Sequence, residues 1–143
     1  MKTPSEEVRR KVQKWVAFAD EDLRFAQTGM SLPGREPPAY RLVAYHAQQC
    51  AEKYLKAYLV CQGVDFPYTH NISTLLELCI DYAVWPTSLR EAEELTDYAI
   101  TTRYPGEDED VMEAEAKRAL EIARTVRGRV QTELKLLGME LEE

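Results

Sequence analysis

Apolar residues recur at spacings of three and four along most of this chain, which is the period of an α-helix. Almost no stretch shows the strict alternation of apolar and polar residues that is typical of a strand. The pattern predicts five helices, at about residues 5–29, 37–62, 69–85, 86–104 and 112–137. Helices of this length joined by short turns pack antiparallel. The predicted fold is therefore all-α, an antiparallel up-and-down bundle of about five helices with a short third helix.

Residues that begin or end helices stand between these segments. Ser5 or Thr3 can cap the first helix, because a side-chain oxygen at that position accepts a hydrogen bond from a free backbone amide. Thr69 or Asn71 can do the same for the third helix. Gly63 suits the C-terminal end of the second helix, where the backbone turns left-handed. The boundaries therefore agree with the apolar pattern.

The length of 143 residues predicts a single domain, residues 1–143. A net charge of −7 disfavours nonspecific nucleic-acid binding, which needs a cationic surface, so RNA is possible but is not the favoured ligand. Three cysteines without a C-x-x-C pair indicate buried thiols in a reducing compartment. No apolar run approaches the ~18 residues of a membrane span. We expect a cytoplasmic protein with no membrane segment.

The second predicted helix mixes amide, imidazole and charged side chains into a segment that otherwise has the pattern of a core helix. Its apolar face, here called the core arc, spans about 120° and comprises Val43, Ala47, Cys50, Ala51, Tyr54, Ala57, Tyr58 and Cys61. A second row, here called the polar strip, lies directly beside this arc and comprises His46, Gln49, Lys53 and Lys56. A polar strip beside an apolar face can line a groove, so these four residues are candidate ligand contacts.

Four larger apolar or aromatic residues of the same helix fall outside the core arc. They are Leu42, Tyr45, Leu59 and Val60. Apolar side chains that do not face their own core are available for another surface. We therefore expect the protein to form a homodimer.

Several chemistries lack the residues that they need. A di-metal site in a helical bundle uses Glu-x-x-His pairs, yet neither His46 nor His70 has a glutamate three positions earlier. Cys50 follows His46 by four positions, but it lies in the core arc, where a thiol packs as a small hydrophobe. The acidic run at 107–110 is typical of a solvated loop. We predict no metal, no cofactor and no catalytic residue.

Three blocks of sequence resemble the HEPN domain family, helical proteins named after higher eukaryotes, prokaryotes and nucleotide binding. The blocks are AQQCAEKYLKA at 47–57, PYTHNI at 67–72 and YAITTRYPG at 98–106. The resemblance covers nearly the whole length of the chain. It implies a small all-helical prokaryotic protein of the kind that is encoded beside a minimal nucleotidyltransferase, as its substrate-binding or toxin partner.

One branch of this family consists of ribonucleases with an arginine, four to six intervening residues and a histidine. Arg41 and His46 satisfy that spacing, but residue 42 is leucine where the family usually has a polar residue. Helical geometry also places the two side chains about 140° apart, so they could meet only across a dimer or through a distorted turn. Arg103 is followed by an acidic segment without a histidine. The sequence therefore favours a protein that is not an enzyme.

The residues and the resemblance together give a set of nucleotide or phosphate contacts: His46, Gln49, Lys53, Lys56, His70 and Arg103. The expected function is a non-catalytic subunit that partners a minimal nucleotidyltransferase, as in a toxin–antitoxin pair. Two alternatives stay open, a metal-independent ribonuclease and a structural dimerisation module. Simpler roles also stay open for single residues, such as a half-buried, satisfied His46 or a His70 that only fixes its loop.

Arg103 gives the first prediction, because it continues the inward-facing row of the fourth predicted helix and its guanidinium needs an acceptor. A guanidinium can hold a phosphate through two hydrogen bonds, whereas an ammonium acts as a point charge. Arg103→Lys should therefore weaken binding of a phosphate-bearing ligand although the charge is kept. Titration of both proteins with nucleotides measures the difference, and equal affinities would contradict a phosphate contact.

Overall fold

The computed structural model describes all residues except 1–2, 33, 35, 100–109 and 142–143. The described residues form five helices and no strand, which confirms the all-α prediction for this part of the chain. The helices are α1 (Glu6–Ser31), α2 (Tyr40–Gln62), α3 (Ile72–Cys79), η1 (Thr87–Tyr98) and α4 (Glu113–Leu136). The third helix is the shortest, with 8 residues, as predicted.

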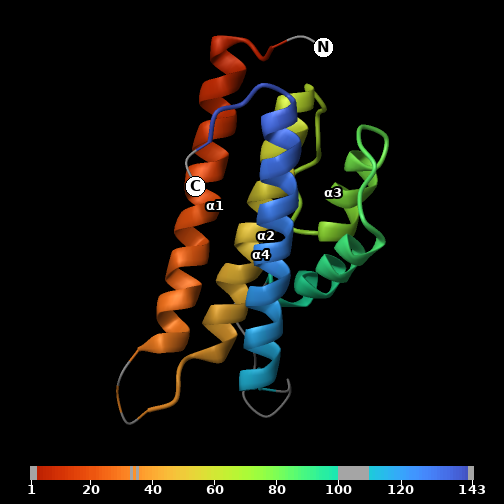
Figure 1. The fold of residues 1–143 in the computed structure, drawn as a ribbon. Helices are drawn as coiled ribbons and strands as arrows, with labels where there is room; N and C mark the ends of the chain where they lie inside the picture. The colour runs from red at the N-terminus through yellow and green to blue at the C-terminus, as the bar shows by residue number, and fades with distance from the viewer. Residues whose placement is uncertain (1–2, 33, 35, 100–109, 142–143) are drawn as a thin grey trace.

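Three long helices lie side by side, and the two short ones pack against one flank (Figure 1). The helices α1 and α2 run antiparallel, whereas α4 runs in the same direction as α2 (Figure 1). The chain can return between α2 and α4 because α3 and η1, with their connections, span the distance. The central helix is α2, which contacts each of the other four.

Because α2 is central, it is buried almost all round rather than along one arc. The core-arc residues are buried except Cys61, which is half-buried, and the arc is too narrow, since Leu55 and Leu59 are also fully buried. The expectation that Leu59 lies on a free surface is wrong, because the helices around α2 leave no open side at this level. Leu42, Tyr45 and Val60 are half-buried and still reach the surface of the single chain.

Capping residues set the helix boundaries as the sequence indicated. The hydroxyl of Ser5 accepts a hydrogen bond from the amide of Val8 at 3.2 Å, which confirms the cap of α1. Of the two candidates for α3, Asn71 is the cap, and its side chain accepts from the amide of Thr74 at 3.2 Å. Gly63 ends α2 with a φ of 72°, in the left-handed region that favours glycine.

Two segments differ from their predicted form. The third helix ends at Cys79 rather than near Trp85, so Tyr82 lies in an exposed turn. The fourth helix is a 3₁₀-helix, η1, and not an α-helix. Its buried residues Leu89, Ala92 and Leu95 recur every three positions, which is the period of a 3₁₀-helix. The predicted end of this helix near residue 104 lies outside the described residues.

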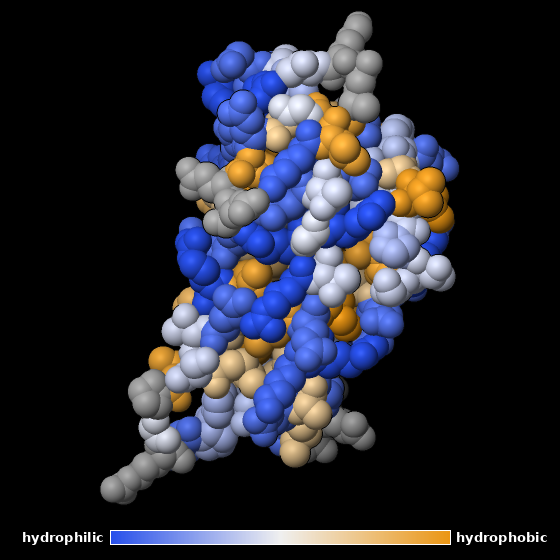
Figure 2. Space-filling view, viewed as in Figure 1, coloured by the Kyte–Doolittle hydropathy of each residue, from blue (hydrophilic) through white to orange (hydrophobic). Residues whose placement is uncertain are grey.

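The surface is that of a protein with a single hydrophobic core. Figure 2 shows a mostly hydrophilic face, with hydrophobic residues in separate areas rather than in one band. In the described part of the chain, no helix is long and apolar enough to cross a membrane. The buried apolar residues instead form one cluster to which all five helices contribute.

The burial of Leu59 can be tested against the rejected surface role. Leu59→Ala should lower the free energy of unfolding by about 2–5 kcal/mol, the range for truncating a fully buried leucine. Leu42→Ala, at a half-buried position of the same helix, is the matched control and should cost less. Urea unfolding followed by circular dichroism measures both. A small effect of Leu59→Ala together with altered self-association would contradict the core position.

Candidate functional site on the α1–α2 face

The polar strip of α2 packs along α1, where the carboxylate of Asp22 holds two of its members. Nδ1 of His46 lies 2.8 Å from one Asp22 oxygen, and Nζ of Lys53 donates to the other at 2.6 Å. The Asp22 side chain is only 12% exposed. Sequence reasoning missed Asp22, since it lies on another helix, 24 residues before His46. One carboxylate thus fixes an imidazole and an ammonium side by side.

A second carboxylate, Glu52, holds Lys56 and His70, the other two basic candidates among the described residues. Nζ of Lys56 donates to Glu52 Oε2 at 2.9 Å, and Nδ1 of His70 lies 2.8 Å from Oε1. The amide of Gln48 also donates to Oε1, at 3.0 Å, and to the backbone oxygen of His70, at 3.2 Å. Glu52 is 3% exposed, so its charge is compensated inside the fold. Through Glu52, His70 joins the strip although it lies beyond the end of α2.

The remaining candidates have other places. Gln49 is buried, and its amide donates to Gln48 Oε1 at 2.9 Å. It therefore extends the hydrogen-bond network behind Glu52 and does not reach the surface as His46 and Lys53 do. Arg103 lies outside the described residues, so its relation to the strip stays a prediction. The structure brings together His46 and Lys53 at Asp22, and Lys56 and His70 at Glu52.

Aromatic rings line the outer side of these ion pairs. The ammonium of Lys56, 6% exposed, lies 5.6 Å from the ring centre of Trp15, 5.7 Å from that of Phe66 and 6.0 Å from that of Tyr68. A cation among aromatic faces is attracted by their negative quadrupole. Lys56 is thus enclosed, with a carboxylate on one side and three rings around it, and it orders the face rather than offering its charge to solvent.

The other basic residues of the face are more accessible. Lys53 lies 6.0 Å from the ring centre of Phe18, and Lys14 of α1 lies 5.8 Å from the same ring. The imidazole of His46 packs on Phe25, with ring centres 4.6 Å apart. The His70 side chain is 49% exposed. Accessible cationic groups and aromatic rings therefore alternate along this face.

A groove of about 260 Å³ on α1 borders this face, here called the Trp15–Phe18 groove. It is lined by Lys11, Lys14, Trp15 and Phe18. These residues stand at i, i+3, i+4 and i+7, which puts them on one side of a helix. Sequence reasoning missed the groove because Trp15 also continues the apolar row of the first helix. The spacing of two lysines around two aromatic residues was the signal that could have found it.

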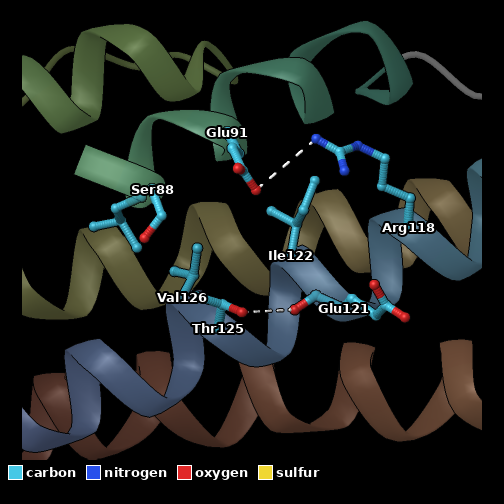
Figure 3. A pocket seen from close by; sticks show the side chains of 8 residues that line it. Ser88, Glu91, Arg118, Glu121, Ile122, Thr125 and Val126 are labelled. Carbon is cyan, nitrogen blue, oxygen red and sulfur yellow. Dashed lines mark hydrogen bonds and ion pairs between the residues drawn. The ribbon is translucent and has the colours of Figure 1, made fainter. Parts of the chain in front are cut away.

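A second cavity, of about 210 Å³, lies between η1 and α4 (Figure 3). The arginine in its lining is already paired, because Arg118 binds Glu94 through two hydrogen bonds of 2.8 and 2.6 Å. Figure 3 also shows the contact between Arg118 and Glu91 above the cavity. This cavity therefore offers fewer open polar groups than the α1–α2 face.

A third carboxylate ties α1 to the rest of the bundle behind the site. Asp20 accepts hydrogen bonds from the hydroxyl of Tyr54 and from Nε of Arg127, the latter at 2.9 Å. Burial and the bond to Asp20 raise the pKa of Tyr54 above its ordinary value. The Tyr54 hydroxyl also accepts from Gln131 at 3.3 Å. One polar cluster thus joins α1, α2 and α4.

Two of the cysteines, Cys50 and Cys79, are buried thiols. Cys50 is fully buried, and burial raises its pKa, so it is a poor nucleophile beside His46. Burial also raises the pKa of Cys79 to about 12. Within the described ranges, no three His, Cys, Asp or Glu side chains are placed to hold a metal ion.

Glu52 provides a test of this arrangement. Glu52→Ala removes the acceptor of the buried Lys56 ammonium and should lower the free energy of unfolding by about 3–5 kcal/mol, as expected for breaking a buried ion pair. Glu113→Ala removes the exposed partner of Lys117 and, as a matched i,i+4 control, should cost less than about 1 kcal/mol. Equal costs in urea unfolding would show that Glu52 is not an anchor.

Comparisons with known proteins agree with the fold. The model of the HEPN domain matches residues 12–133. The crystal structure of TT1696 from Thermus thermophilus is similar, with 29% identity, coverage of 85% of this chain and 97% of that chain, and a TM-score of 0.73. The crystal structure of ST0689, an archaeal HEPN homologue, shares 26% identity, with coverage of 93% and 98% and a TM-score of 0.67. No curated protein matches. The match over most of the length, together with these two structures, shows that the chain belongs to the HEPN domain family.

Proposed function

We propose that this HEPN chain is a non-catalytic subunit that binds a nucleotide or another phosphate-bearing ligand. In this proposal it works as a homodimer beside a minimal nucleotidyltransferase, in a pair of the toxin–antitoxin type. The observation that carries the proposal is the row of basic side chains on the α1–α2 face, held by Asp22 and Glu52. The spacing of His46, Lys53 and Lys56 along α2 makes these three residues candidates independently of the carboxylates that hold them.

The geometry supports phosphate binding because a carboxylate holds the lysine ammonium in place and leaves some of its N–H donors unbonded. An ammonium has three donors, and Lys53 gives one hydrogen bond to Asp22. Its remaining donors can meet phosphate oxygens. The carboxylates lower the local positive potential, but they also fix the side chains, which reduces the entropy lost when a ligand binds. His46 and His70 hold Nδ1 against carboxylates, so each can donate to an anion through Nε2 only in its protonated form.

A second function, metal-independent ribonuclease activity, is favoured by one specific observation. A carboxylate on Nδ1 of a histidine orients the ring and leaves Nε2 for proton transfer, and Asp22 stands in that position at His46. The arginine that this chemistry requires is less well placed. Arg41 precedes His46 by five residues on the same helix, α2, so the two directions differ by about 140°. A joint site would need a second copy of the chain.

The test is a titration of the purified full chain with nucleotides and with a candidate nucleotidyltransferase. Lys53→Ala should weaken nucleotide binding by about tenfold, the loss of one charge-assisted contact, and the difference should shrink at high salt. Lys117→Ala on α4 is the matched control, because this lysine is also paired with a carboxylate but lies away from the site, and its affinity should equal that of the wild type.

Three other outcomes would contradict the proposal. Unchanged binding in Lys53→Ala, with the fold intact by circular dichroism, would mean that the strip serves packing only. RNA cleavage without metal that is lost in Arg41→Ala and His46→Ala would favour the ribonuclease. Self-association in light scattering, combined with no measurable binding of nucleotides or of the nucleotidyltransferase, would favour a dimerisation module.

A further inference from the structure

Two aromatic rings on the outer side of α1 are open to solvent beside the polar strip. The Phe18 side chain is 43% exposed, and the half-buried Trp15 lies one helical turn before it. Both line the Trp15–Phe18 groove. Single exposed apolar residues are normal on protein surfaces, but an aromatic pair that lines a groove is a feature of binding sites. The groove is therefore a place where a flat apolar group can be buried.

Positive charge surrounds this groove although the chain as a whole carries −7. Lys14 and Lys53 flank Phe18, with ammonium-to-ring distances of 5.8 and 6.0 Å. Both ammonium groups lie over the ring, at distances near the outer limit of about 6 Å for a cation–π contact, so neither is in close contact with it. Lys11 at the other end pairs with Glu7. Within the described ranges, no carboxylate forms an ion pair with Lys14.

We propose that the Trp15–Phe18 groove holds the base of a nucleotide, stacked on Phe18, with its phosphates directed toward Lys14 and Lys53. This inference rests on the proposed function. It specifies a nucleotide as the ligand and the groove as the part of the site that binds its base. Stacking of bases on aromatic side chains tolerates all four bases, because each has a π-face. The lysines then bind the phosphates electrostatically.

The size of the groove fits part of a nucleotide rather than all of it. At about 260 Å³ it falls just below the roughly 300–1,000 Å³ of sites that enclose a drug-sized ligand. A base can enter it while the sugar and the phosphates stay at the surface, where Lys53 and the polar strip begin. In this arrangement the groove binds the base, and Lys53 and the polar strip bind the charged phosphates.

The other cavities do not combine an open ring with an available cation. In the cavity between η1 and α4, Arg118 is bound by Glu94. A third cavity, near Trp85, contains Arg90, whose guanidinium is held by Glu77 and Glu93. The Trp15–Phe18 groove differs from both, because Lys14 pairs with a ring and not with a carboxylate.

The experiment compares nucleoside triphosphates with inorganic triphosphate, which carries the charge but has no base. Phe18→Ala should weaken binding of ATP, GTP, CTP and UTP by about tenfold and change that of inorganic triphosphate by less than about twofold. Phe18→Tyr keeps the ring and should bind as the wild type does. Tyr82→Ala is the control, because Tyr82 is a similarly exposed aromatic residue after α3, a helix that does not contact α1, and this variant should bind normally.

Tryptophan fluorescence gives an independent readout. The nucleotides, but not inorganic triphosphate, should quench Trp15, and this signal should be lost in Trp15→Phe, which keeps Trp85. If Phe18→Ala binds all four nucleotides normally while Lys53→Ala is weakened, the inference fails and the proposed function stands. If the wild type binds neither nucleotides nor inorganic triphosphate, both fail. Loss in Phe18→Ala of binding to a partner protein only would make the groove a docking surface and overturn the inference.

Discussion

The buried carboxylate of Glu52 is the constraint on which the α1–α2 face depends. A charge at 3% exposure is tolerated only when donors surround it, and Lys56, Gln48 and His70 supply them. Two of these donors come from α2 itself, but His70 comes from the connection that follows. Glu52 therefore holds that connection against α2, and Asn71 begins α3 directly after it.

An acidic protein can present a basic face because its carboxylates and its cations occupy different depths. At Asp22 the carboxylate side chain is 12% exposed, whereas the Lys53 and His46 side chains that it holds are 23% and 24% exposed. Lysine favours this arrangement, since its long apolar stem packs along the helix while the ammonium reaches outward. The aromatic rings of α1 then shape the surface between the cations. The net charge of the chain does not indicate this local arrangement of charges.

The sequence could predict features that one helix contains, and it failed where two helices must meet. The polar strip follows from spacing within α2, and the caps at Ser5 and Asn71 follow from local hydrogen bonding. Asp22 could not be assigned to His46, because their contact depends on how α1 packs on α2. Leu59 was misplaced for the same reason, since a pattern within one helix does not show how many neighbours surround it. The buried residues of η1 recur every three positions, but over so few turns this spacing is difficult to distinguish from that of an α-helix.

The packing of the short helices that connect α2 to α4 has a consequence for local unfolding. Among the described residues, α3 packs only against α2 and η1, and with 8 residues it makes fewer contacts than any other helix. Elements with the fewest packed neighbours are the first to open in local unfolding. Opening at the start of α3 would draw His70 away from Glu52 and leave that buried carboxylate short of a donor. A ligand seated on His70 would oppose this step, so occupancy of the face and amide-hydrogen protection of the short helices are thermodynamically linked.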